Sequence, residues 1–594
     1  MQRLGVVLAM VAAFAVVAIG FAAPASAVQV SATKLEKSTK KASKKAKATC
    51  KKAGKVNRSK KASKSARKKA KKACARAKKN SKRLTKKLKS VNAQYFDVCK
   101  RGCKYKTVQS GANAAGTWQK KNKKRTATVR VQPGTYVEGV LLRGKTEGRK
   151  FDDLKIIGVK KDKTPATNAR NVILEGTDAK TILKGNSPVW QPGDAATQPA
   201  QNAIDSEDID GLVMKNMWAR NYLNNTFFVW ASNVPADNSH CADFVMDNLV
   251  SSDTKSYGMF SRNCYGGKFL NSEGWNHGDS AFYVGETPCD DEAWTNKGPD
   301  PVACQEDPQW TLIDNVKSHQ GSLGYSGTNS KYVKIKDSAF YNNGAGIVPN
   351  TLDSELFEPS GSLVLENNDI FWNNLNYYSS GSPMETVIGN GNPTGIGIML
   401  YGTDGVVVRD NRIFGNEQWG VATFSGPELF GVNVGDDAKN MNNQFTNNKM
   451  GLNGTDKNGN YDFFTDYSGG GNCWSGNTSS TFAPGNGSVP VSTIYPACPQ
   501  DKVINDDVLS FNFGAGLQVN AAYLDPQEPW RDLSTIFGLA EVRPSELQEC
   551  SWNITPHLAS YTDSDGDTYE PFRTDPVSAQ ACTDLANRLS PYNP

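Results

Sequence analysis

The stretch NHGD holds the first residues in this sequence whose types and spacing suit catalysis. The 594-residue chain has only four histidines, and His277 stands two residues before Asp279, just ahead of the alternating run SAFYVG. A histidine near a carboxylate is suited to general acid–base catalysis. Two cationic residues nearby, Arg262 and Lys268, could serve as the base that abstracts a proton from an acidic sugar. These four are the candidate catalytic residues. The competing hypothesis is that NHGD is a polar corner in a repetitive scaffold.

Acidic insertions that contain aromatic residues supply the candidates for binding. They span residues 229–240, 286–308, 349–361 and 425–439, and each follows the third apolar run of a repeating unit. Aromatic rings suit the C–H faces of sugars, and carboxylates could hold Ca²⁺. The candidate substrate-binding residues are Trp230, Trp294, Trp310, Asp290, Asp291, Asp353 and Glu355. The alternative is that acidic loops only keep a long scaffold soluble and its sheet edges unpaired.

The elements that must position these residues are short strands in a repeat. From Asn202 onward, segments such as GLVMKNMWARN, DFVMDNLVSSD and SLVLENNDIFWNN recur at intervals as short as 23 or 24 residues. A strand repeat of this length without helices predicts a β-solenoid, whose coils stack about 4.8 Å apart. Polar residues at the corners then form ladders between coils. The aligned corner residues are Asn216, Asn248, Ser272, Asn315, Ser338, Asn368 and Asn411.

The twelve cysteines predict disulfides, because the sequence has no C-x-x-C pair and no cluster with zinc-site spacing. Cys241 moved forward by one 24-residue coil falls beside Cys264, so we predict that these two cysteines join neighbouring coils. The other predicted pairs are local: Cys289–Cys304, Cys473–Cys498 and Cys550–Cys582. The pairing of the four N-terminal cysteines stays open: Cys50, Cys74, Cys99 and Cys103. A Cys50–Cys74 bridge would staple a helical hairpin.

The N-terminal residues predict a secreted protein with a basic arm. Arg3, the apolar run 4–23 and the sequence Ala-Ser-Ala at 25–27 are typical of a signal peptide over residues 1–27, with a retained anchor as the alternative. After cleavage no membrane span is expected, and the disulfides favour an extracellular or cell-wall-associated location. The arm spans residues 28–92, and its stretch 31–90 holds 23 lysines and 4 arginines against one acid, Glu36.

Two interpretations of this polybasic arm stay open. It is either a solvated spacer or an anchor to an anionic cell-envelope polymer. Nucleic acid is not an expected partner, because no aromatic residue interleaves the lysines between Val28 and Asn92.

The C-terminal extension over residues 501–594 lacks the repeat and contains DSDGDTYE. Asp563, Asp565 and Asp567 alternate like the start of a calcium loop, although Thr568 replaces the EF-hand glycine. With Asp575 as a further ligand, this segment is the candidate Ca²⁺ site, and a surface acidic turn is the alternative. No other cofactor is predicted.

Two groups of motifs carry a resemblance to known proteins. YKTVQSGANAAGT, VRVQPGTYVEGV, LKIIGV and VILEG resemble the N-terminal cap and first coils of the pectate-lyase-like superfamily. GIGIML, RDNRIFGN and GNCWSGNT resemble secreted actinobacterial right-handed β-helix repeat proteins. The resemblance covers about residues 99–498. It implies an all-β, right-handed parallel β-helix over residues 93–500, with a short N-terminal capping helix and a helical or disordered Lys/Ala-rich arm.

The predicted function is binding of an extracellular polysaccharide in a surface groove, with pectate-lyase-like cleavage or epimerisation as the associated chemistry. The motifs of pectin methylesterases and polygalacturonases are mostly absent, so the fold does not name the activity. The second hypothesis is a non-enzymatic cell-surface rod for glycan binding or adhesion, anchored by the polybasic arm. The sequence leaves open whether the protein is an enzyme and which glycan it binds.

Overall fold

The computed structural model describes most of residues 94–499, parts of residues 41–91, and two short strands, β35 (Tyr561–Thr562) and β36 (Thr568–Tyr569). The longer gaps in the main body are 177–200, 233–240, 289–307, 376–393, 425–438 and 483–490. The predicted signal peptide lies outside the described residues. The chain divides into two units, Met1–Gln94 and Tyr95–Pro594. Among the residues that the structure describes, no helix has the length and apolarity needed to cross a bilayer.

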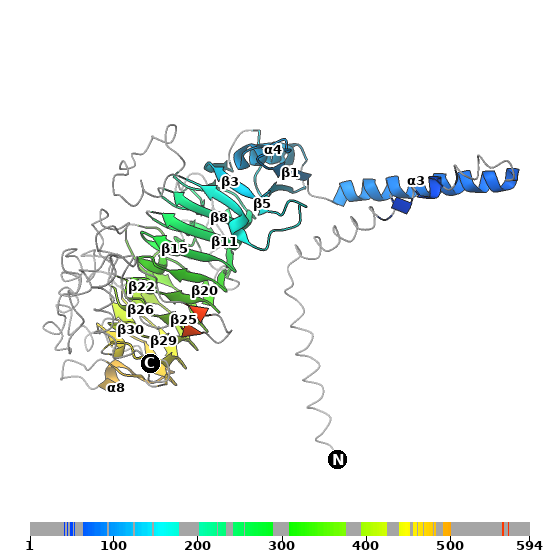
Figure 1. Ribbon diagram of the computed structural model, residues 1–594. Helices are drawn as coiled ribbons and strands as arrows, with labels where there is room; N and C mark the ends of the chain where they lie inside the picture. The colour runs from blue at the N-terminus through cyan, green and yellow to red at the C-terminus, as the bar shows by residue number, and fades with distance from the viewer. Residues whose placement is uncertain are drawn as a thin grey trace, which may run out of the picture. The chain divides into compact units, whose positions relative to one another are not determined.

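The second unit is a stack of parallel-strand coils (Figure 1). Sheet B has ten strands and forms one side of each coil. Its strands are β4 (Val140–Arg143), β7 (Ile204–Glu207), β9 (Phe227–Trp230), β12 (Met259–Arg262), β16 (Ser280–Gly285), β19 (Leu323–Thr328), β22 (Ala345–Asn350), β26 (Ile396–Tyr401), β30 (Trp419–Phe424) and β33 (Tyr461–Thr465). Each pairs in parallel with the next, so the all-β parallel β-helix predicted from the sequence is confirmed.

Sheet A has twenty strands and bends into two limbs. The first limb contains β2 (Ala127–Val131), β5 (Lys155–Gly158), β14 (Lys268–Leu270), β17 (Thr311–Asp314), β20 (Val333–Lys336), β24 (Val364–Glu366), β28 (Val407–Arg409), β31 (Gln444–Thr446) and β34 (Cys473–Ser475). The second contains β3 (Gly134–Val137), β6 (Val172–Glu175), β15 (Glu273–His277), β18 (Lys317–His319), β21 (Ala339–Tyr341), β25 (Asp369–Phe371), β29 (Arg412–Phe414) and β32 (Lys449–Met450). β8 (Val213–Tyr222) and β11 (Val245–Thr254) run through both limbs, and β1 (Gln94–Val98) pairs with β2 at the N-terminal end.

A helix closes the N-terminal end of the core, as predicted. α4 (Val108–Lys121) begins at Thr107, whose side chain accepts a hydrogen bond from the Ser110 amide. The Glu138 carboxylate accepts two more, from the amides of Val108 and Gln109 at 2.7 and 3.0 Å. These contacts satisfy amides that a helix start leaves without partners. The helix then covers apolar side chains that the first coil would otherwise expose to water.

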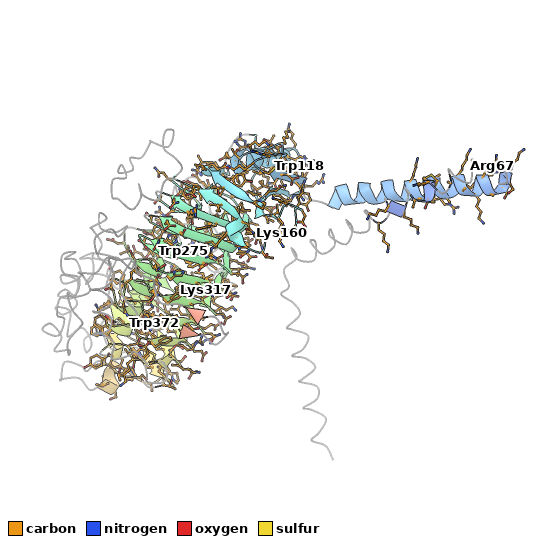
Figure 2. The ribbon with its side chains drawn as sticks, viewed as in Figure 1. Arg67, Trp118, Lys160, Trp275, Lys317 and Trp372 are labelled. Carbon is orange, nitrogen blue, oxygen red and sulfur yellow. A yellow bond between two sulfur atoms is a disulfide. The ribbon has the colours of Figure 1, made fainter. Side chains whose placement is uncertain are left out.

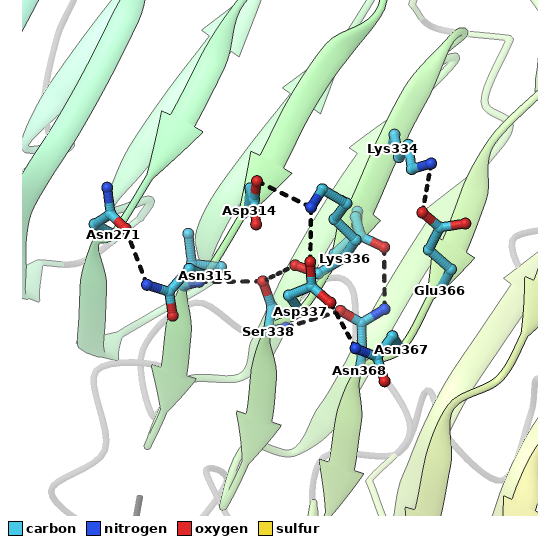
Figure 3. Close-up of polar contacts among 12 residues, drawn as sticks. Asn271, Asp314, Asn315, Lys334, Lys336, Asp337, Ser338, Glu366, Asn367 and Asn368 are labelled. Carbon is cyan, nitrogen blue, oxygen red and sulfur yellow. Dashed lines mark hydrogen bonds and ion pairs between the residues drawn. The ribbon is translucent and has the colours of Figure 1, made fainter. Parts of the chain in front are cut away.

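An outer ladder of Asn and Asp residues marks the bend between the two limbs of sheet A. Its members adopt positive φ, which asparagine and aspartate tolerate better than other residues with side chains. The Asn315 amide donates to Asn271 at 2.9 Å, and the Asn367 amide donates to Asp337 at 2.6 Å (Figure 3). The aligned positions at this bend are Asn216, Asn248, Asn271, Asn315, Asp337, Asn367, Asp410 and Asn447.

A second, inner ladder lies one residue further along the chain. Here Asn368, Asn411 and Asn448 are fully buried, and their side-chain amides bond from coil to coil at 3.0 Å. The predicted corner ladder therefore exists, but the alignment mixed two positions. Asn216, Asn248 and Asn315 belong to the outer ladder, whereas Ser272, Ser338, Asn368 and Asn411 belong to the inner one. The one-residue error arose because an outer Asn or Asp often precedes an inner Asn or Ser.

Disulfides tie the chain at four places among the described residues. Cys241 and Cys264 are direct partners in the parallel pair β10 (Cys241–Ala242) and β13 (Cys264–Tyr265), so the predicted bridge between coils is confirmed. The predicted Cys473–Cys498 pair is also present. The structure adds Cys50–Cys74 and Cys99–Cys103, which the sequence left open. The predicted pairs Cys289–Cys304 and Cys550–Cys582 lie outside the described residues.

Candidate functional site

The outer face of sheet B is the candidate site. The acidic insertions begin directly after β9, β16, β22 and β30, four strands of this one sheet, as the repeat predicts. Residues alternate along each strand between the core and the outside. We define the sheet B face as the outward side chains of the strands from β4 to β22 together with the residues that flank those strands.

Five aromatic rings lie side by side on the sheet B face. Phe228 stacks on Trp230 at 5.7 Å between ring centroids and on Phe260 at 4.7 Å. Phe260 in turn contacts Tyr257 at 4.5 Å and Tyr283 at 4.4 Å. Trp230, Phe228 and Tyr257 are half-buried, so the row is partly open to solvent. The rings come from β9, β12 and β16 and their flanks, and they form a continuous apolar strip across three coils.

A charged group borders the strip on its N-terminal side. The Arg143 guanidinium donates to Asp205 at 2.7 Å and forms an ion pair with Glu207 at 2.8 Å. The Trp230 indole N–H also donates to Asp205, at 2.9 Å. Both oxygens of Asp205 are engaged, because Asn202 donates to the second one at 3.1 Å. This network fixes the Trp230 ring at the edge of the face.

On the other side of the strip lie Arg262, Glu286 and Glu355. The Arg262 guanidinium donates to both oxygens of Glu286, at 2.9 and 2.7 Å, and the Glu286 side chain has no solvent exposure. The Glu286 carboxylate raises the pKa of Arg262 further, against the opposing effect of burial. The Tyr283 hydroxyl donates to Glu355 at 3.0 Å. Burial raises the pKa of Glu355, and the nearby Glu286 carboxylate adds to that rise.

Asp279 stands beside these residues at the start of β16. Burial raises the pKa of its carboxyl group to about 6; the Tyr257 hydroxyl, which donates to it, opposes the rise, and the Glu355 carboxylate adds to it. Its Oδ1 atom is buried and has no hydrogen-bond partner among the described residues. Such a group holds a proton more readily than an ordinary aspartate. We refer to Tyr257, Asp279, Tyr283, Glu286, Glu355 and Arg262 as the tyrosine–carboxylate cluster.

His277 lies inside the coil and not on the sheet B face. Its side chain is 2% exposed, with Nδ1 2.7 Å from the Thr254 hydroxyl and Nε2 3.1 Å from the Ser251 hydroxyl. Burial lowers its pKa to about 3, so the ring is neutral at physiological pH. The strand register aligns His277 with Asn343 and Asn373 of an inner ladder. His277 and Asp279 therefore contact different residues: the His277 ring bonds to Ser251 and Thr254 in the interior, whereas Asp279 faces Tyr257.

Three other predicted residues are also separate from the cluster. Lys268 is exposed on β14 of sheet A, so it does not converge with Arg262. Trp310 is 37% exposed on the corner before β17, where it contacts Tyr332. Asp353 is exposed in the segment after β22. Burial raises the pKa of Tyr401, and the Asp353 carboxylate adds to that rise, so Asp353 lies near Tyr401 and is not part of the cluster. Of the predicted residues, the structure brings together Arg262, Asp279 and Glu355 in the cluster and places Trp230 on the same face.

The remaining candidates cannot be placed. Trp294, Asp290 and Asp291 lie outside the described residues, as do the candidate calcium ligands Asp563, Asp565, Asp567 and Asp575. Within the described part of the chain, no group of three or more His, Cys, Asp or Glu side chains is arranged to hold a metal ion.

Sequence comparison finds no match, either among protein-family models or among curated proteins. Solved structures do match in fold. The A-module of Azotobacter vinelandii mannuronan C-5 epimerase AlgE6 is 14% identical with a TM-score of 0.36, over 64% of this chain and 91% of its own. An alginate lyase from Paenibacillus sp. is 12% identical with a TM-score of 0.30, over 63% and 98%. A GH87 α-1,3-glucanase catalytic domain is 11% identical with a TM-score of 0.35, over 68% and 67%. These matches assign no activity to this chain.

Sequence reasoning missed most of the residues that build the cluster. Tyr257, Tyr283 and Glu286 were not singled out, nor were Asp205 and Arg143. A signal was present for Tyr283: its position in the alternating strand faces outward, where a large tyrosine is unusual for a scaffold. The contacts with Glu355 and Asp279 come from other segments, and no pattern along the chain indicates them.

Proposed function

We propose that this protein binds a polysaccharide along the sheet B face. The observation that carries the proposal is the strip of five aromatic rings flanked on both sides by hydrogen-bonding carboxylates. Sugar-binding sites combine apolar contact with a few fixed polar groups. The strip crosses coils that stack about 4.8 Å apart, so it offers a repeating surface along which a polymer can extend.

The charge of the face favours a neutral polysaccharide over an acidic one. Both arginines of the face already pair with carboxylates, Arg143 with Asp205 and Glu207, and Arg262 with Glu286. Asp279 and Glu355 add further carboxyl groups that no described cation pairs with at ion-pair distance. A polymer with a carboxylate on each sugar would meet like charge here without a compensating cation.

We further propose that the face cleaves glycosidic bonds, with Asp279 as the proton donor. Glycoside hydrolysis uses two carboxyl groups, one of which is protonated near neutral pH. Asp279 has the raised pKa that a donor needs, and Glu355 lies close enough to influence it. Lyase or epimerase chemistry needs a base instead. His277 and Lys268 are not on this face, and Arg262 is held in its charged form by Glu286.

Binding is tested by affinity electrophoresis of the full chain in gels that contain neutral glucans, xylans or polyuronates. We expect retardation by a neutral polysaccharide. Trp230→Ala should weaken this binding at least fivefold, because it removes the half-buried indole ring at the end of the strip. Trp275→Ala on sheet A is the matched control and should bind like the unmodified protein. Equal binding by the two variants would show that the sheet B face is not the site.

Cleavage is tested with the polysaccharide that binds, by following the release of reducing ends. Asp279→Asn should keep binding and lose release by at least a hundredfold, because an amide cannot donate the proton. If the unmodified protein binds but releases nothing, the cleavage proposal fails and the non-enzymatic glycan-binding hypothesis stands.

A further inference from the structure

The basic arm is a disulfide-linked pair of helical segments. α3 (Lys64–Val91) begins after Ser63, whose hydroxyl accepts a hydrogen bond from the Ala66 amide. The described residues between 41 and 53 are also helical. The Cys50–Cys74 disulfide joins the two segments with 4.7 Å between the Cα atoms. Side chains extend from α3 on several sides, with Arg67 near its start (Figure 2).

The contact between the segments is narrow and apolar. On α3 the half-buried positions include Ala70, Cys74 and Ala77, which recur every three or four residues and form one face. On the first segment Ala53 is 6% exposed. Small side chains bring the two segments close together, but they bury little area, so the apolar contact alone contributes little stability. The disulfide is therefore the main link that holds two like-charged segments together.

Cations from both segments line one hollow on this pair. Its lining includes Lys45 from the first segment, Lys69, Lys72 and Arg76 from α3, and the small residues Ala73 and Ala77. No acidic residue occurs between positions 37 and 96 to neutralise them. Without such a counter-charge, the cations repel one another and attract anions from solution.

We propose that this hollow is a binding site for a slim linear polyanion, and that the Cys50–Cys74 disulfide assembles it. Cations from both segments and the small side chains of Ala73 and Ala77 line the same hollow, which suits a narrow anionic chain. Lysines act as point charges and set no demand on the shape of the anionic group. Stacking of nucleic-acid bases would require aromatic side chains, and the arm has none between Val28 and Asn92. The proposal concerns the first unit alone and does not depend on the sheet B face.

The strength of binding follows from counting the cations. The four cations of the hollow contribute about −3 to the slope of log K against log salt concentration for a flexible polyanion. Without the disulfide, the cations of the two segments are no longer held at a fixed distance from one another, so they do not act as one binding site. The advantage of holding both on the same polymer is then lost. We expect the affinity to fall about tenfold and this contribution to the slope to approach about −2.

The test uses the full chain and inorganic polyphosphate as the probe, with binding measured by fluorescence anisotropy at several salt concentrations. The first variant is Cys50→Ser with Cys74→Ser, and the second is Lys69→Ala with Lys72→Ala, which keeps the disulfide. Lys68→Ala with Lys71→Ala, two exposed lysines of α3 that do not line the hollow, is the matched control. The first and second variants should weaken binding about tenfold, and the control should not.

Two results would overturn the proposal. If the cysteine variant binds polyphosphate as tightly as the unmodified protein, the disulfide does not assemble the site. If double-stranded DNA binds at least as tightly as polyphosphate at the same charge concentration, the hollow does not select a slim chain. Circular dichroism of each variant must retain the β-sheet signal of the body, so that lost binding is not lost folding.

Discussion

Replacing Arg262 with methionine tests how the tyrosine–carboxylate cluster is held together. In the structure the Arg262 guanidinium donates to both oxygens of Glu286, and the Glu286 side chain is fully buried. Methionine keeps most of the aliphatic volume and removes the charge. The variant therefore leaves a carboxylate inside the protein with one remaining donor among the residues that the structure describes, the Leu356 amide at 3.4 Å.

The expected loss of stability follows from burial. Breaking a buried ion pair by removing one partner costs about 3–5 kcal/mol, because the other charge remains desolvated. The Arg262 side chain is 36% exposed, so water partly screens the pair and the lower end applies. We expect about 3 kcal/mol, which corresponds to roughly a 150-fold change in a local opening equilibrium.

Native-state hydrogen exchange measures this opening where it occurs. The amides to follow are those of Asn263 and Glu286, which bond to Gly285 and Thr328 in the neighbouring coils at 3.2 and 2.9 Å. Their exchange should accelerate roughly 150-fold in the variant. Arg409→Met is the matched control, because Arg409 pairs with Glu366 on the surface, where its side chain is 45% exposed. That change should cost less than about 1 kcal/mol.

A second variant separates charge from packing. Arg262→Met combined with Glu286→Gln has no buried charge and keeps an acceptor for the Leu356 amide, so protection should return to within about 1 kcal/mol of the original. If the single variant exchanges no faster than Arg409→Met, or if the double variant gives no recovery, the pair does not hold the cluster as argued.

Two further predictions concern the interior. Because the pKa of His277 is lowered to about 3, the folded state binds fewer protons than the unfolded state, and stability should fall as the pH drops below 6.5. The loss is about 1.4 kcal/mol per pH unit. Asparagine does not titrate, so between pH 7 and pH 5 the unfolding free energy of His277→Asn should fall about 2 kcal/mol less than that of the unmodified protein. Equal pH slopes for the two proteins would contradict the burial of a neutral ring. Asn373→Ala would remove the acceptor of the Asn343 backbone amide, one of the two acceptors of the Asn343 side-chain amide, and the side-chain donor to the Phe340 carbonyl, at a cost of about 3–5 kcal/mol in hydrogen-exchange stability. Gln444→Ala, at an exposed position of β31, is the control and should change stability by less than about 0.5 kcal/mol; an equal loss in both would show that the inner ladder contributes nothing.

The fold was predictable because each coil requires the same residue types at the same positions. Apolar alternation, a corner Asn and a turn recur, so one correct alignment predicts many strands. The Cys241–Cys264 bridge followed from the repeat length alone. The prediction placed Ser272, Ser338, Asn368 and Asn411 in one ladder with the outer residues, one position out of register, because Asn occurs at both the outer bend and the inner ladder. Only backbone conformation and burial separate the two positions.

The candidate site was only partly predictable, for a physical reason. A polar residue at a corner points either into the coil or out of it, and one residue of register decides which. His277 and Asp279 are two residues apart, yet the first bonds to interior hydroxyls and the second faces Tyr257. The sequence therefore identified the segment but could not show that the two residues contact different partners. Contacts such as Tyr283 with Glu355 join positions 72 residues apart, which no local pattern reveals.

The outer ladder also makes the stacking of the coils independent of the length of the insertions. Asn315 bonds to Asn271 across 44 residues and Asn248 bonds to Asn216 across 32, and both bonds are 2.9 Å long. Coils of different length thus form the same Asn–Asn bond in the same geometry. An insertion after a sheet B strand can change in length or sequence without shifting the coils on either side. The insertions at the sheet B face could then diverge and change which ligand is bound while the strands beneath them stay in register.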